Sequence, residues 1–133
     1  MAKIRIHDAD ETPWTRIGDM TRNASVLTQG ELDSHIRFAE PGDETSPQLM
    51  EVNYVPDAVV DPHFHDSAEI IYVVEGELHF GDRVLGPGAS LYVGEQAVYG
   101  YRAGPRGLKI VNFRPRADFS FHPKGGERPA SAE

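Results

Sequence analysis

Between residues 48 and 113, short runs of apolar or β-branched residues alternate with turn residues, and none repeats with the period of a helix. Glycine and proline stand between the runs, where they favour turns. This pattern is typical of an all-β sandwich or barrel, and 133 residues is about the length of one domain. The expected strands are Ala24–Thr28, His35–Phe38, Leu49–Val55, His63–His65, Ile70–Val74, Glu77–Phe80, Arg83–Leu85, Ala89–Val93, Val98–Arg102 and Leu108–Phe113.

Two of the turns carry the residues that their geometry requires. Gly81-Asp82 joins two apolar runs and has glycine first, which suits a type II′ hairpin turn. In Gly86-Pro87-Gly88, proline presets the first central position and the second glycine is free to adopt a positive φ. These turns predict a tight change of direction on each side of Arg83–Leu85.

Outside this region the pattern predicts an arm and a tail. We expect an N-terminal arm over residues 1–20, one barrel domain over residues 21–123 and a flexible C-terminal tail over residues 124–133. Trp14 follows a proline and could pin the arm onto the body or onto a partner subunit.

Charge and composition exclude several classes of function. Lysine and arginine number 13 against 21 acidic residues, so the formal charge of −8 disfavours nucleic acid and anionic membranes as partners. Cysteine is absent, which excludes disulfides, thiolate zinc sites and iron–sulfur clusters. With no targeting segment and no apolar run of membrane-spanning length, we expect a cytoplasmic protein.

The stretch around His63 carries the candidate chemistry. His63 and His65 are two residues apart, so both imidazoles project from one face of an extended chain, and Glu69 shares their parity. Two nitrogens and one carboxylate are the facial ligand set that leaves open positions on a divalent iron-type metal. The glutamate also leads into the apolar run Ile70–Val74, where a buried carboxylate needs a charge partner and a metal would supply one.

These residues resemble the first motif of the cupin superfamily, G(x)5-H-x-H-(x)3–4-E-(x)6-G, with Asp57 in place of the leading glycine and Gly76 as the last. The second motif, G(x)5-P-x-G-(x)2-H-(x)3-N, matches only at its first glycine. The residues at its motif positions are Gly88, Gly94, Gln96, Tyr99 and Ala103. The resemblance covers roughly residues 45 to 115 and implies a single-domain jelly-roll β-barrel. It also implies a metal held inside the barrel by His63, His65, Glu69 and whatever Tyr99 contributes.

Tyr99 stands where the family has a histidine, and three roles are open to it. It is a fourth metal ligand through its oxygen, a general acid or base whose pKa the cation lowers, or a packing residue with a hydrogen-bonded hydroxyl. By parity and position, the other residues expected to line the pocket are Tyr54, Ile71, Val73 and Tyr101.

The leading hypothesis for function is a metal-dependent cupin enzyme that acts on a small oxygen-bearing organic molecule by iron-dependent dioxygenation. One alternative is a redox-neutral lyase or isomerase with Tyr99 as base, and another is a non-catalytic small-molecule-binding or sensory cupin. Iron is preferred as the cofactor, although manganese, nickel and zinc suit the same ligands.

Two further features predict contacts. Ile70, Tyr72 and Val74 make the second face of the central strand apolar, so we expect another sheet or a second subunit to cover it, and we predict a homodimer. Arg114 and Arg116 form a small basic cluster, which is expected to pair with aspartate or glutamate.

Overall fold

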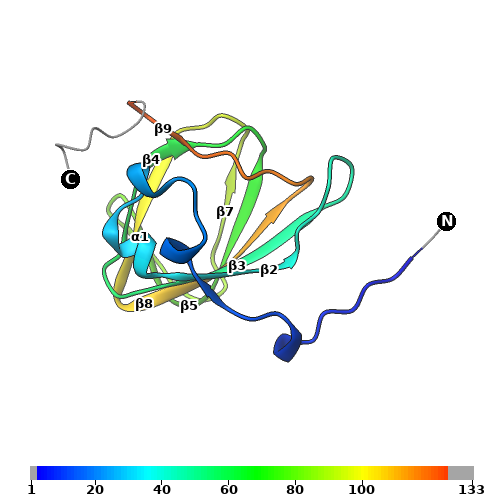
Figure 1. The fold of residues 1–133 in the computed structure, drawn as a ribbon. Helices are drawn as coiled ribbons and strands as arrows, with labels where there is room; N and C mark the ends of the chain where they lie inside the picture. The colour runs from blue at the N-terminus through cyan, green and yellow to red at the C-terminus, as the bar shows by residue number, and fades with distance from the viewer. Residues whose placement is uncertain (1–2, 126–133) are drawn as a thin grey trace.

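Strands β5 and β8 are the longest elements of a nine-stranded antiparallel sheet within residues 3–125, the part of the chain that the computed structural model describes (Figure 1). The strands are β1 (Thr15–Arg16), β2 (His35–Glu40), β3 (Gln48–Tyr54), β4 (Val59–Phe64), β5 (Glu69–Phe80), β6 (Arg83–Leu85), β7 (Ser90–Val93), β8 (Tyr99–Arg114) and β9 (His122–Pro123). The helical elements are α1 (Gln29–Asp33) and the 3-10 turns η1 (Ala9–Glu11), η2 (Ile17–Asp19) and η3 (Ala24–Val26).

Strand β8 is the central strand of the sheet, because it pairs along both of its edges. One edge of β8 runs along β5, and the other pairs with β3 near its C-terminal end and with β4 near its N-terminal end. The predicted all-β jelly-roll class is confirmed. No helix among the described residues is long and apolar enough to cross a membrane.

The two long strands were each predicted as two shorter ones. The predicted breaks are bends within continuous strands, marked by register shifts in the β5–β8 pairing. Gly76 has φ 78°, and a Cβ on it would lie 2.2 Å from the carbonyl oxygen of Gly107. Glycine here lets two strands cross closely instead of ending one of them.

The predicted strand Ala24–Thr28 is wrong, because this segment forms η3 and the start of α1. Thr28 and Glu31 make a capping box: the Thr28 hydroxyl accepts from the Glu31 amide at 3.2 Å, and the Glu31 carboxylate accepts from the Thr28 amide at 3.0 Å. These contacts satisfy amides at the start of the helix. The Thr-x-x-Glu spacing was a local signal for this helix.

The predicted turns have the expected backbone. Gly81 has φ 62° and Gly88 has φ 93°, and the Ala89 amide donates to the Gly86 carbonyl at 3.1 Å. Asp57 and Gln96, which replace motif glycines, also have φ 62°. Both motif positions therefore require the left-handed region, which aspartate tolerates better than glutamine does.

Side chains of β5 alternate between the core and the outside as predicted. Ile71 and Val73 are fully buried, whereas Ile70 and Tyr72 remain 44% and 48% exposed. Within residues 3–125 no second layer of sheet covers this outer face. The expectation that the same chain buries it is therefore not met.

The N-terminal arm is pinned by Trp14, whose ring lies under the Arg37 guanidinium at 4.6 Å and the Lys109 ammonium at 5.5 Å. The arm thus docks on its own barrel through cation–π contacts. Elements β1 and η2, inside the predicted arm, are joined to the barrel through the pairing of β1 with β2. Most of the predicted tail, residues 126–133, lies outside the described residues.

Candidate functional site

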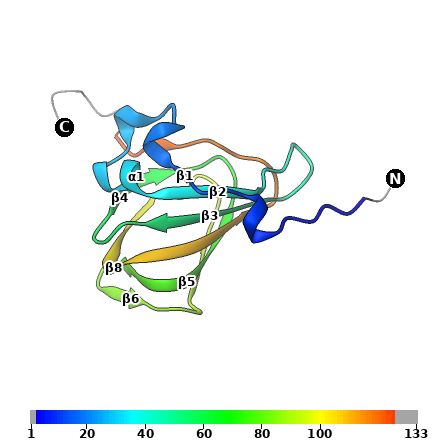
Figure 2. The ribbon, with the colours of Figure 1, turned by 60° about the horizontal axis from the view of Figure 1, so that its bottom comes forward.

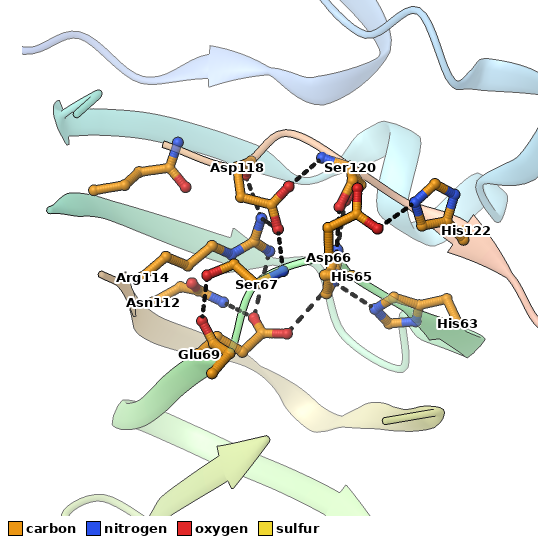
Figure 3. A network of polar contacts seen from close by, with 12 residues as sticks. His63, His65, Asp66, Ser67, Glu69, Asn112, Arg114, Asp118, Ser120 and His122 are labelled. Atoms are coloured by element: carbon orange, nitrogen blue, oxygen red, sulfur yellow. Dashed lines mark hydrogen bonds and ion pairs between the residues drawn. The ribbon is translucent and has the colours of Figure 1, made fainter. Parts of the chain in front are cut away.

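His63 and His65 face each other inside the barrel (Figure 3). His63 lies on β4 directly opposite Tyr99 of β8, so the sheet register points both side chains inward. His65 follows the end of β4 and keeps the same parity. Both histidines are more than nine-tenths buried, and their Nε2 atoms are 3.0 Å apart.

The outer nitrogens of the two rings fix their tautomers. His63 Nδ1 lies 2.8 Å from the Asp61 carbonyl and His65 Nδ1 lies 2.5 Å from the Ser120 carbonyl. A carbonyl can only accept, so each Nδ1 carries a hydrogen and each neutral ring turns an Nε2 lone pair inward. Burial lowers the pKa of His63 to about 3, with a further contribution from His65. Burial, followed by the charge of Arg114, also lowers the pKa of His65.

Glu69 lies beside the histidines at the start of β5 and is held by donors on both oxygens. Its Oε2 accepts from the Tyr99 hydroxyl at 2.8 Å and lies 3.5 Å from His65 Nε2. Its Oε1 accepts from Asn112 Nδ2 at 2.6 Å and from Arg114 Nη2 at 3.4 Å. Burial, together with the Glu69 charge, raises the pKa of Tyr99, so the phenol keeps its proton and donates it.

Arg114 is the buried charge partner of Glu69. Arg114 is 4% exposed, and its guanidinium donates to the Asp118 carbonyl oxygen and lies 3.6 Å from the Asp118 carboxylate. The expected pairing of Arg114 with an acidic residue is confirmed. Arg114 therefore supplies a positive charge that the sequence analysis assigned to a metal alone.

Residues 115–123, here called the C-terminal strap, cross the open end of the barrel and end in β9. The Phe121 ring stacks on His63 at 4.4 Å, almost parallel, and the Ser120 carbonyl orients His65. The strap is anchored by Asp118, whose carboxylate accepts from the amides of Ser67 and Ser120 at 3.0 Å each. Burial raises the pKa of Asp118, but these hydrogen bonds outweigh it and the net shift is downward.

A cavity of about 140 Å³ lies inside the barrel against the two histidines. Tyr54, Tyr99 and Tyr101 line it, as expected, and the hydroxyls of Tyr54 and Tyr101 are 2.5 Å apart. Ile71 and Val73 are not among its lining residues, because both are completely buried and have no accessible surface toward the cavity. Burial raises the pKa of Tyr54 and of Tyr101, so both remain neutral hydroxyls.

The donor atoms of His63, His65 and Glu69 have the chemistry of metal ligands. No three histidine, aspartate or glutamate side chains in residues 3–125 are gathered so that they could hold an ion as they stand. The two Nε2 atoms are nevertheless 3.0 Å apart, which is the separation of two nitrogens that each lie about 2.1 Å from one cation. A cation between them would also relieve the repulsion between their lone pairs. Glu69 Oε2 is the adjacent oxygen, with one hydrogen bond and a free lone pair. The donor types, two imidazole nitrogens and one carboxylate, are those that a divalent ion takes, but the three side chains are not gathered around one point in the described residues.

Several residues around the site were missed from the sequence. Asn112 points inward from β8, as do Ile110 and Arg114. A polar amide at an inward position of a predicted strand could have identified Asn112 as a site residue from the sequence. Ser120 and Phe121 carried no such signal, since their roles depend on the path of the strap.

A family model described as Cupin matches residues 44–104. The comparison with curated proteins found no match.

Solved structures with the same fold include KdgF from Halomonas sp., which is 24% identical, with a TM-score of 0.62 over 84% of this chain and 95% of that one. An acetylacetone dioxygenase from Acinetobacter johnsonii is 12% identical, with a TM-score of 0.69 over 98% and 85%. The DMSP lyase DddQ from Ruegeria pomeroyi DSS-3 is 18% identical, with a TM-score of 0.67 over 89% and 64%. At these identities the likeness shows the fold.

Proposed function

Because this chain is a member of the cupin superfamily, we propose that it is a metal-dependent enzyme that acts on a small oxygen-bearing organic molecule, and that its reaction is iron-dependent dioxygenation. The observation that carries the proposal is the pair of inward-facing Nε2 atoms, 3.0 Å apart, on the wall of the cavity inside the barrel. Structures of similar fold include an acetylacetone dioxygenase, which supports the reaction class.

His63, His65 and Glu69 would hold the ion. When bound there, a divalent iron would supply Lewis acidity and redox chemistry toward substrate and dioxygen. The Asp61 and Ser120 carbonyls keep both imidazoles in the ligating tautomer. Asn112 and Arg114 hold one oxygen of Glu69 away from the histidines, which leaves the other oxygen directed toward His65.

Tyr99 in this proposal is a hydrogen-bond donor that orients Glu69. Its hydroxyl donates to Oε2, and its raised pKa keeps the proton on the phenol. The three tyrosines present neutral hydroxyls toward the cavity, where they can hydrogen-bond an oxygen-bearing substrate. Phe121 and the strap limit the access of water from the open end.

A second candidate reaction is a redox-neutral elimination or isomerisation with Tyr99 as base. Its support is that Tyr99 lines the cavity and that a DMSP lyase has a similar fold. We rank it second because the Tyr99 phenol is protonated and donates a hydrogen bond to Glu69, so it must first lose its own proton before it can act as a base.

The test measures bound metal and oxygen consumption. Protein purified without added metal is analysed for its elements, and we expect close to one iron per chain. His63→Ala should lose the metal, whereas Tyr99→Phe should keep it, because Tyr99 contacts the carboxylate. His35→Ala, an exposed histidine of β2, is the matched control.

With a panel of small diketones and 2-oxo acids, iron-loaded protein should consume oxygen, and the stripped protein should not. Turnover without oxygen uptake would favour the lyase or isomerase. Ligand binding that survives removal of the metal, with no turnover, would favour a binding protein. Retention of metal by His63→Ala would contradict the proposed site.

A further inference from the structure

A second, larger cavity adjoins the inner one at the open end of the barrel. This mouth cavity has a volume of about 520 Å³ and shares His65, Arg114 and Phe121 with the inner cavity. At about 30 Å³ for each molecule, the inner cavity of about 140 Å³ has room for roughly five waters. A ligand longer than a few heavy atoms must therefore continue into the mouth cavity.

An exposed apolar side chain lies on each side of the mouth cavity. Met20, which follows η2, is 47% exposed, and Phe119 of the strap is 62% exposed. Figure 2 shows the helical turns near the N-terminus and the strap, coloured orange, at the same end of the barrel, with β6 at the opposite end. Large apolar side chains left exposed around a cavity mark a binding surface.

Charges in the mouth cavity are already paired or face water. The Arg114 guanidinium is placed between Glu69 and Asp118, and the Asp118 carboxylate accepts backbone amides. Arg22 lines the cavity from an exposed position. The interior of the mouth cavity therefore suits an uncharged group.

We propose that the mouth cavity is a subsite for an uncharged alkyl or aryl tail of the substrate, whose oxygen-bearing head enters the inner cavity. The proposal rests on the proposed function, because it assigns the head to the cavity beside the histidines. It narrows the substrate class to amphipathic molecules and disfavours polyhydroxylated ones such as sugars. Burial of each additional methylene should tighten binding about fourfold.

Straight-chain 1-alkanols test the subsite without requiring turnover. The chain has three methionines, of which Met20 lines the mouth and Met50 lines both cavities, so methyl-labelled methionine reports on each place. On titration from 1-butanol to 1-octanol, both signals should shift saturably, with the dissociation constant falling about fourfold per methylene. Equal affinity along the series, or a Met20 signal that does not move, would overturn the proposal.

Substitutions at the rim distinguish alkanol binding at the subsite from non-specific binding to other exposed apolar side chains. Met20→Asp and Phe119→Ser should each weaken 1-octanol binding at least tenfold, read from the Met50 methyl group. Val84→Asp is the matched control, since Val84 is 55% exposed on β6 at the far end of the barrel. An equal loss in this control would also overturn the proposal.

The orientation of the ligand is tested with bound Mn²⁺, whose paramagnetism broadens nearby protons. The hydroxyl end of 1-octanol should broaden more than its terminal methyl, and the reverse order would overturn the proposal. If 1-octanol dissociates a dimer of the protein, the rim is a contact surface for a second copy of the chain and not a substrate subsite. That result would also overturn the proposal. Failure of Mn²⁺ to bind counts against the proposed function alone, because the alkanol titration needs no metal.

Discussion

At the scale of single residues, the Glu69 carboxylate accepts hydrogen bonds from Tyr99, Asn112 and Arg114. Within residues 3–125, Arg114 is the only one of these donors that carries a positive charge. Both side chains are almost fully buried, so neither charge is screened by water. Removing one member of such a pair leaves the other buried without a counter-ion.

Arg114→Met should therefore destabilise the metal-free protein by about 3–5 kcal/mol, measured by urea unfolding. The matched control is Arg5→Met, which removes an exposed pair with Glu40 and should change the unfolding midpoint far less. Metal should restore part of the loss, because a cation near Glu69 replaces the missing charge. A change as small as that of the control would show that Arg114 does not compensate Glu69.

The histidines predict a pH dependence of stability in the metal-free protein. The pKa of His63 falls from 6.5 to about 3 on folding, so the unfolded chain binds more protons between these values. Stability is then fully present above pH 6.5 and is lost as the pH falls toward 3. Urea midpoints between pH 7 and 4 should fall accordingly, and they should fall less steeply in His63→Gln. A midpoint that rises on acidification would contradict the buried neutral pair.

The part of the site that could be predicted is the part that lies close together in sequence. His63, His65 and Glu69 share one parity, and burial follows that parity because the chain stays extended except for one bend. Arg114 is 45 residues from Glu69, so their contact depends on the register of β5 against β8. Ser120 depends on the strap, an irregular segment whose path no periodic pattern predicts.

At the scale of elements, the outlines of the strands could be predicted and their continuity could not. Alternation of apolar residues identifies a strand locally, but it does not tell a bend from an end. At Gly76 the deciding fact is the approach of Gly107 from another strand, which is a tertiary contact. In α1 the deciding fact is local, since the capping box fixes where the helix begins.

Gln96 offers a test at this scale, because it holds a left-handed backbone with a side chain attached. Gln96→Gly should raise the free energy of unfolding by about 0.5–1 kcal/mol, since the strain it removes exceeds the added chain entropy. Glu95→Gly, at the neighbouring position without a positive φ, should lower it. A loss of stability in Gln96→Gly would indicate that the glutamine side chain makes a stabilising contact.

At the scale of the whole molecule, an outward apolar face remains on β5, β7 and β8. Ile70 pairs in register with Tyr92 and Phe113, and Tyr72 lies two residues further along β5. Tyr92 is 75% exposed, which is a large exposed area for an aromatic side chain beside other exposed apolar residues. We propose that this face is the contact of a homodimer, in which the same patch meets itself across a two-fold axis.

Light scattering at micromolar concentration should give the mass of a dimer, and Tyr92→Asp should give that of a monomer. Val59→Asp, a similar change on the exposed side of β4, should leave the dimer intact. A wild-type monomer at that concentration would remove the proposal.

The position of the strap in the chain has a consequence for biosynthesis. Every strand of the barrel except β9 is made on the ribosome before residues 115–123 emerge. The barrel can thus close while its histidines are still reachable from its open end. Cofactor loading would be easiest in that interval, before Phe121 covers His63 and the Ser120 carbonyl locks the second ring.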